Sequence, residues 1–134
     1  MFRKLSHVGI AVNDLRAASE VYKNIFGVDQ VRTEDVPDQR VRVAFFHVAN
    51  TSFELTEATS PDSPIAKFLE KRGEGVHHLS FEVDDIRAEL ARLKALGFRL
   101  IDEDPRKGAG GHLIAFVHPK STNGILIELC QKML

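Results

Sequence analysis

The chain has 134 residues, 18 Lys and Arg against 19 Asp and Glu, and a single cysteine. This length suits one compact domain or two half-size modules that share a core. The balanced charge gives no summed field that would attract nucleic acid or an anionic membrane, and one cysteine excludes an intrachain disulfide and a multi-cysteine zinc site. No apolar run approaches the ~20 residues needed to cross a bilayer, and no signal-peptide pattern opens the sequence, so we expect a cytoplasmic protein.

The first half begins with a strand pattern over residues 5–12, where apolar and polar positions alternate. Asn13 or Asp14 can cap a helix over LRAASEVYKNIF, which Gly27 ends. Three further strands are expected in this half, at about 28–33, 41–48 and 51–57. A linker helix over about 63–73 is indicated by Ser63 as N-cap, Pro64 at the first helical position and Gly73 at the end.

The second half gives the same order of elements. Residues 77–83 alternate as a strand, Asp84 or Asp85 can cap a helix over IRAELARLKAL, and Gly97 follows it. Strands are expected at about 98–101, 112–118 and 124–130. The chain therefore reads as a single domain over 1–134, with module one at about 1–60 and module two at about 75–134.

The two halves also match residue by residue at an offset of 71, which aligns His7 with His78. The same offset pairs several further identical residues: Val12 with Val83, Asp14 with Asp85, Arg16 with Arg87, Ala44 with Ala115, Phe45 with Phe116 and His47 with His118. Such self-similarity is the signature of a structural repeat. We expect two βαβββ modules of similar structure.

Strand alternation places one His and one Glu of each half away from the apolar side chains. His7 and His78 lie on the faces opposite Val8 and Leu79, and Glu54 and Glu128 each stand between two apolar neighbours in the last strand of their half. A single histidine at a strand start is more often a hydrogen-bonded structural residue, and an unpaired buried carboxylate is costly. Recurrence in register favours a site that holds one divalent cation such as Co, Ni, Zn, Mn or Fe.

The other histidines and the cysteine have weaker functional interpretations. His77 lies on the face opposite His78, which favours packing, while His47 and His118 match by repeat, which fits structural equivalence as well as function. His112 follows a glycine-rich loop and fits either ligand contact or simple surface exposure. Cys130 is expected as a buried strand residue rather than a nucleophile.

Three segments, HVGIAV, GVHHLSFEV and HPKSTNGILIEL, resemble the vicinal oxygen chelate superfamily, also called the glyoxalase/bleomycin resistance/dioxygenase fold, over essentially the whole chain. The resemblance implies an α+β fold in which paired βαβββ modules form a curved, barrel-like mixed sheet around a metal cleft. The superfamily's metal ligands carry over onto His7, Glu54, His78 and Glu128. By family the ion is Co, with Ni, Zn, Mn or Mg as alternatives, and a homodimer is expected.

Within the superfamily, SPIAKFLEKRGEGVHHLSFEVDDI, RKGAGGHLIAFVHPKS and NGILIELCQ are most similar to the methylmalonyl-CoA epimerase family. That likeness implies an isomerase that interconverts the two configurations at C2 of a CoA thioester through a metal-stabilised enolate. Glu128 is expected to be the base, with a pKa raised by desolvation. Some epimerases carry a second acid-base Glu where this chain has Val43, and the nearby acids Glu34, Asp35 and Asp38 have no pattern that aims them at a site.

Contacts to the CoA part of the substrate are expected from cations and backbone N–H groups, which bind phosphate. The candidates are Lys107, Gly108, Gly110, Gly111, Lys120 and Ser121. A turn explains the glycines equally well. Two alternative functions remain: a glutathione-dependent lyase similar to glyoxalase I, which shares the ligand set, and a non-catalytic ligand-sequestering protein of the bleomycin-resistance type.

Overall fold

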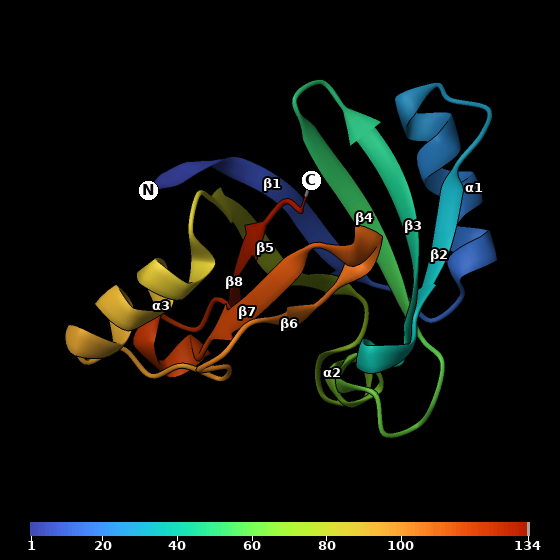
Figure 1. Cartoon of the computed structure of the whole chain (residues 1–134). Coiled ribbons are helices and arrows are strands. Elements are labelled where there is room, and N and C mark those ends of the chain that lie inside the picture. The colour runs from blue at the N-terminus through green and yellow to red at the C-terminus, as the bar shows by residue number, and fades with distance from the viewer. Residues whose placement is uncertain (134) are drawn as a thin grey trace. The chain divides into compact units, whose positions relative to one another are not determined.

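The computed structural model describes residues 1–133 (Figure 1). The chain forms two compact units. The first unit is Val8–His77, and the second consists of Met1–His7 together with His78–Leu134. The boundaries cut two strands, β1 (Phe2–Ala11) and β5 (Gly75–Val83), so each of these strands supplies residues to both units. The single-domain interpretation stays a prediction, and its last residue, Leu134, lies outside the described residues.

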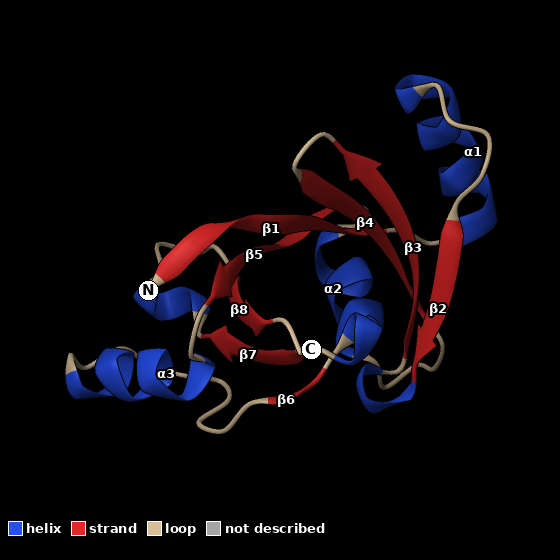
Figure 2. Cartoon of the chain, turned by 45° about the horizontal axis from the view of Figure 1, so that its top comes forward, coloured by secondary structure: helices blue, strands red, loops and turns tan. Residues whose placement is uncertain are grey.

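In the first unit, β2 (Arg32–Val36), β3 (Val41–Val48) and β4 (Thr51–Ala58) form an antiparallel meander, and β1 lies next to β4. Helix α1 (Leu15–Phe26) packs its apolar side on one face of this sheet (Figure 2). That face carries an aromatic and aliphatic core made by Ala44, Phe46, Phe53, Leu55, Tyr22 and Phe26. The other face of the same strands therefore carries the alternate residues, which include Val43, Phe45 and Glu54.

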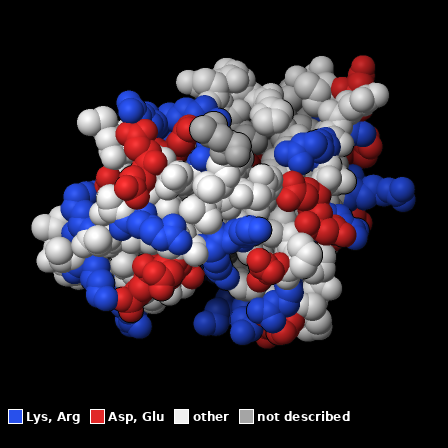
Figure 3. Space-filling model, viewed as in Figure 1, with Lys and Arg blue, Asp and Glu red and all other residues white. Residues whose placement is uncertain are grey.

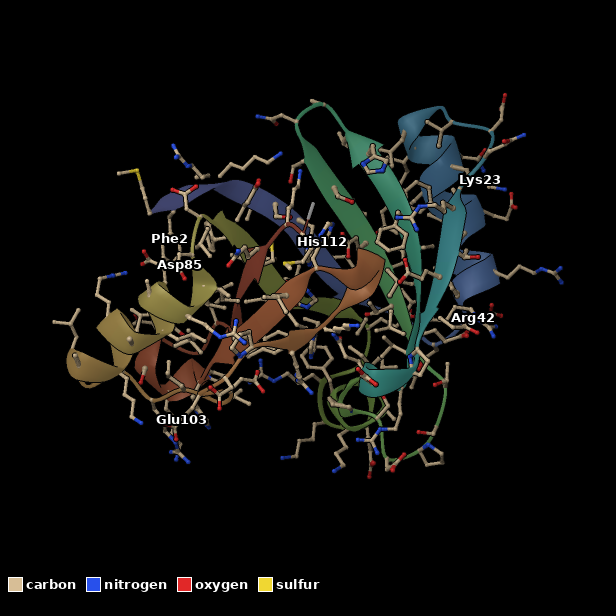
Figure 4. All side chains as sticks on the ribbon, viewed as in Figure 1. Phe2, Lys23, Arg42, Asp85, Glu103 and His112 are labelled. Carbon is tan, nitrogen blue, oxygen red and sulfur yellow. The ribbon has the colours of Figure 1, made fainter. Side chains whose placement is uncertain are left out.

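Helix ends follow the expected capping chemistry. Asp14 caps α1 by accepting a hydrogen bond from the Ala17 N–H at 3.1 Å, and Gly27 ends the helix in the left-handed region at φ 68°. Helix α3 (Ile86–Ala95) begins in the same way. Asp85 lies beside the start of the helix (Figure 4). Its carboxylate accepts from the Ala88 N–H at 3.1 Å. Both capping predictions are confirmed.

In the second unit the strand order is β1-β5-β8-β7-β6. Strand β8 (Ile127–Gln131) runs parallel to β5 and antiparallel to β7 (Leu113–Val117). Helix α3 covers one face, where its residues Ile86 and Leu90 pack with Val83, Ala115 and Leu129. This packing leaves the opposite face of β5, β8 and β7 to Ser80, Glu128 and Phe116, which lie side by side in register.

Two predicted strands lie elsewhere than expected. The strand expected at 28–33 forms instead at Arg32–Val36, because Val28 and Val31 pack against the core from the connection after α1. The strand expected at 98–101 is reduced to one bridge, Leu100 to Val117, and the edge strand is instead the two-residue β6 (Arg106–Lys107). An edge strand of two residues is too short for an alternating pattern to show in the sequence.

The face of β5 with more polar residues is also the more deeply buried one. Ser80 is fully buried and His78 is 8% exposed, whereas Leu79 and Phe81 are only half-buried. The apolar residues Leu79 and Phe81 are thus less deeply buried than the polar residues on the opposite face of the strand. The reason is that β8 and β7 extend the His78 and Ser80 face with further side chains, while α3 reaches only Val83 on the other face.

The linker helix is confirmed as α2 (Pro64–Arg72), which Ser63 caps by accepting from the Ile65 N–H at 3.1 Å. Three short 3-10 turns complete the elements, at Pro37–Gln39, Ala109–Gly111 and Pro119–Ser121. Within residues 1–133, no helix has the length and apolar character that a membrane span requires. Lys, Arg, Asp and Glu are interspersed on the visible surface, as the balanced composition leads us to expect (Figure 3).

Candidate metal centre

Three of the four expected ligand residues meet in the second unit. His7 comes from β1, His78 from β5 and Glu128 from β8, and the strand register explains the meeting because β8 pairs with β5 at Ser80–Glu128, two residues from His78. Their side chains are 13%, 9% and 5% exposed, respectively. The three residues thus form a buried cluster of two imidazoles and one carboxylate.

The atoms that face one another in this cluster are all potential donors of a lone pair. The Nε2 atoms of His7 and His78 lie 3.0 Å apart, and Nε2 of His7 lies 3.2 Å from Oε2 of Glu128. Nε2 of His78 lies 3.8 Å from Oε1 of the same carboxylate. One ligand atom from each residue can be chosen so that all lie within 4.8 Å of one another.

This arrangement fits a divalent cation. Two atoms bound to the same ion at about 2.0–2.1 Å are at most about 4.2 Å apart, and the three separations given above meet that limit. Oε2 of Glu128 is buried and receives no well-aligned hydrogen bond within the part of the chain that the structure describes. An unsatisfied buried carboxylate oxygen is costly unless a cation takes its lone pair.

Electrostatics within the cluster favour the charged carboxylate. Burial raises the pKa of Glu128, but a protonated His78 imidazole and the hydrogen bond from His7 lower it further, so the pKa lies at about 2 when the imidazoles are charged. The expectation that desolvation would raise the pKa of Glu128 is therefore wrong in net direction. A carboxylate that stays ionised is well suited to bind a metal.

Neighbouring side chains hold the imidazoles in place. The rings of His7 and His78 are nearly perpendicular, with centroids 5.1 Å apart, and the His78 ring meets the Phe116 ring edge to face at 5.7 Å. Nδ1 of His7 lies 3.4 Å from Oγ of Ser6, which leaves Nε2 directed at the cluster. Sequence reasoning missed Ser6 and Phe116 because neither position carries a chemical signature.

Glu54, the fourth expected ligand, belongs to the first unit. It is buried on β4, at 8% exposure, and pairs in register with Phe45 of β3. It lies on the sheet face opposite the aromatic core, as strand alternation indicates. Its role as a metal ligand stays a prediction.

Three other histidines have structural contacts. His77 packs its ring edge to face on Phe68 at 5.0 Å, in agreement with the packing interpretation. Nδ1 of His118 accepts from the Lys120 N–H at 3.0 Å, and Nδ1 of His112 accepts from the Met133 N–H at 3.2 Å. These contacts account for the side chains without catalysis.

The other two candidates lie on strands. His47 is exposed on β3, and Cys130 is buried on β8 as expected. Burial raises the pKa of the Cys130 thiol, which disfavours the nucleophilic thiolate.

The residues expected to contact CoA lie in the second unit. Gly110 and Gly111 adopt left-handed backbone conformations, and the loop closes on itself through hydrogen bonds from Gly108 to His112 and from Gly111 to Gly108. The Ser121 hydroxyl accepts from the Arg99 N–H at 2.9 Å, so one lone pair is already used within the fold. Lys107 lies on β6 and Lys120 in the 3-10 turn before Thr122. Their role with CoA stays a prediction.

The family model of the Glyoxalase/Bleomycin resistance protein/Dioxygenase superfamily matches residues 6–116 of the chain. The chain belongs to this superfamily. The match begins within β1 and ends within β7, so it covers most of both βαβββ modules, and the predicted α+β fold class is confirmed.

Several members of the superfamily that are similar to this chain over nearly its whole length are epimerases. The ethylmalonyl-CoA/methylmalonyl-CoA epimerase of Cereibacter sphaeroides is 44% identical over 133 residues, 98% of this chain and 99% of that protein. The methylmalonyl-CoA epimerase of Mycobacterium tuberculosis matches with a TM-score of 0.91 and 40% identity, over 97% of this chain and 88% of that one. A methylmalonyl-CoA epimerase in complex with methylmalonyl-CoA and NH4+ has a TM-score of 0.91 and 36% identity, over 98% and 96% of the two chains. All three are isomerases, the enzyme class expected from the sequence.

Proposed function

We propose that this superfamily member is a metal-dependent methylmalonyl-CoA epimerase, which interconverts the R and S configurations at C2 of the CoA thioester. The observation that carries the proposal is the buried cluster of His7, His78 and Glu128, with donor atoms 3.0–3.8 Å apart. The choice of substrate is supported by a relative that is 44% identical over nearly its full length and is named an ethylmalonyl-CoA/methylmalonyl-CoA epimerase.

The donor set determines which ions suit the site. Two imidazole nitrogens are borderline ligands and a carboxylate oxygen is a hard ligand. This mixed set suits Co, with Ni, Zn, Mn or Mg as alternatives. A bound divalent ion would polarise the thioester carbonyl and stabilise the negative charge that develops when C2 loses its proton. We propose His7, His78 and Glu128 as its ligands, together with Glu54 from the first unit.

Glu128 is the residue we propose as a proton acceptor at C2. Its pKa lies at about 2 beside charged imidazoles, so its carboxylate is ionised there and can accept a proton. A carboxylate with so low a pKa is a weak base. Proton removal by Glu128 therefore depends on strong acidification of C2 by the enolate-stabilising site.

Epimerisation also needs a proton donor on the opposite side of C2, and Glu34 is the residue that the strand register favours. In the strand register, Glu34 of β2 pairs with Val43 of β3, and Glu54 of β4 pairs with Phe45 of β3. Val43 and Phe45 are two residues apart and so point to the same side of β3. Glu34 and Glu54 therefore share one face of the β2-β3-β4 sheet. Asp35 lies on the other face, where Oδ1 accepts from the Arg42 guanidinium at 2.7 Å. Position 43 itself, a buried Val, has no proton to offer.

Arg32 and Phe45 hold Glu34 in position. The Arg32 guanidinium lies 4.0 Å from the Phe45 ring centroid and pairs with Oε1 of Glu34 at 3.1 Å. The Glu34 side chain is 30% exposed, so its carboxylate can exchange a proton with solvent between turnovers. We infer that Glu34 takes the second acid-base role.

The remaining parts of the proposal come from the sequence. Lys107, Gly110, Gly111, Lys120 and Ser121 stay the predicted contacts to CoA in the second unit. The homodimer and the cytoplasmic location also stay predictions.

A paired assay tests the function against its alternatives. Purified protein loaded with Co²⁺ is given a single epimer of methylmalonyl-CoA and, separately, the hemithioacetal of methylglyoxal and glutathione. We expect the first to yield the other epimer and the second to stay unchanged. Turnover of the hemithioacetal alone would favour the lyase, and binding without turnover of either would favour a sequestering protein.

A further inference from the structure

Outside the metal cluster, the first unit has a surface hollow of about 350 Å³ along helix α2. Its lining comes from α2 and from the start of β5: Pro64, Lys67, Phe68, Glu70, Lys71, Arg72 and His77. The volume lies at the lower end of the range for sites that bind small organic molecules, about 300–1,000 Å³. It is larger than a single inorganic anion requires.

The lining of the hollow contains three cationic side chains, Lys67, Lys71 and Arg72. Among the ion pairs of the described residues, none involves Lys67, Lys71 or Arg72, although many other arginines and lysines, such as Arg40 and Arg42, are paired. Lys67 and Lys71 lie one helical turn apart on α2, where their like charges repel each other. Against these three cations the lining offers one carboxylate, Glu70.

Two aromatic rings belong to the lining, together with the apolar ring of Pro64. The rings of Phe68 and His77 meet edge to face, at 86° and with centroids 5.0 Å apart, and both side chains are half-buried. The Arg72 guanidinium lies 5.9 Å from the Phe68 centroid. Aromatic and guanidinium groups are the surfaces on which planar bases stack, and lysines are donors to phosphate.

We propose that this hollow binds a phosphorylated adenine nucleotide, with Lys67, Lys71 and Arg72 holding the phosphates and Phe68 with His77 contacting the base. A CoA thioester carries such a group at one end, so the inference extends the proposed function and rests on it for the identity of the natural ligand. It assigns the nucleotide phosphates to this hollow instead of to Lys107 and Lys120. The nucleotide site itself depends only on the hollow. A separate nucleotide effector has the same chemistry, and the experiment distinguishes the two sources.

The first measurement is calorimetric titration of the metal-loaded protein with adenosine 3′,5′-bisphosphate at low salt. We expect saturable binding that the double variant Lys67→Ala/Lys71→Ala weakens at least tenfold and that added salt also weakens. The matched control is Arg16→Ala/Arg87→Ala, which removes the same charge from exposed positions on α1 and α3 and leaves binding unchanged. Absence of binding to the unaltered protein, or equal binding by the Lys67/Lys71 variant, would overturn the proposal.

The second measurement assigns the source. If the nucleotide belongs to the substrate, the Lys67/Lys71 variant raises KM for methylmalonyl-CoA at least tenfold and leaves KM for methylmalonyl-pantetheine, which lacks the nucleotide, unchanged. If it is an effector, the variant has an unchanged KM for both thioesters although it binds the bisphosphate at least tenfold more weakly than the unaltered protein, and either result supports the site. A His78→Ala variant separates the two proposals, because it loses metal but keeps nucleotide binding if the hollow is the site.

Discussion

The Nε2 atoms of His7 and His78 lie 3.0 Å apart, although 71 positions separate the two residues in the chain. Strands β1 and β5 bring them together, and each residue stands at the same place in its own half of the internal repeat. Two nitrogen lone pairs directed at one point beside a buried carboxylate favour a shared cation over a mere packing contact.

Removal of one imidazole should abolish metal binding. We expect His78→Ala to lower the content of Co²⁺ after loading and desalting from one ion per chain to near zero, because the cluster loses one of its nitrogen ligands. His47→Ala, which alters an exposed histidine on β3, is the control and should retain the ion. Elemental analysis measures both, and a full complement of metal in the His78 variant would contradict the cluster as a metal site.

Glu128→Gln separates metal binding from proton transfer. The amide oxygen can still face the ion, whereas it cannot accept a proton from C2, so we expect metal to be retained in part and the epimerisation rate to fall by about 10²–10⁴-fold. Turnover is measured at a fixed metal occupancy. Unchanged turnover would remove Glu128 from its role as base while leaving it as a ligand.

Glu34→Gln should make the enzyme one-sided. An epimerase with one of its two acid-base groups removed still exchanges the C2 proton of the epimer that faces the remaining base, but it no longer converts that epimer to the other. We expect this pattern in Glu34→Gln and normal conversion in Asp35→Asn, which alters the adjacent carboxylate on the opposite face. Loss of conversion in both variants, or in neither, would count against the assignment of Glu34.

The ion pair between Arg3 and Asp84 predicts a measurable pH effect. A hydrogen bond of 2.7 Å from the Arg3 guanidinium lowers the pKa of Asp84 below its ordinary value of 3.8. A carboxyl whose pKa is lower in the folded state stabilises that state above about its ordinary pKa, and the contribution disappears as the pH falls below it. In Arg3→Gln the pKa of Asp84 should rise, which NMR titration detects; an identical titration in both proteins would show that the pair does not form in solution.

The helix caps give a prediction about stability. Loss of the Asp85 carboxylate leaves the Ala88 N–H without its acceptor, so Asp85→Ala should lower the free energy of unfolding by about 1 kcal/mol. Asp29→Ala, in the exposed segment after α1, should change it by less than about 0.5 kcal/mol. Urea unfolding compares the two, and an equal effect would mean that the cap contributes nothing specific.

Local chemistry explains why much of the fold could be predicted from the sequence. Asp14, Asp85 and Gly27 act through contacts within a few residues, so the helix ends follow directly from the chain. Alternation in β1, β5 and β8 places His7, His78 and Glu128 away from the helix-covered core, and the structure brings these three residues together. Glu54 obeys the same alternation in the first unit.

The features that could not be predicted depend on contacts between distant segments. The edge strand β2 is mostly polar and exposed, so its register with β3, which aligns Glu34 with Val43, leaves no periodic pattern in the sequence. The pKa of Glu128 is lowered by two imidazoles that lie on other strands, so the local sequence around Glu128 does not reveal this effect. The hollow along α2 likewise needs His77 beside Phe68, and only the fold provides that contact.

The most direct test of the central claim is C2 exchange. Metal-loaded protein is incubated in deuterated water with one epimer of methylmalonyl-CoA, and mass spectrometry and chiral analysis follow deuterium at C2 and the appearance of the other epimer. We predict that both occur, that both stop when a chelator removes the metal, and that both return when the metal is restored. Absence of exchange with Co, Ni, Zn, Mn and Mg alike would contradict the account.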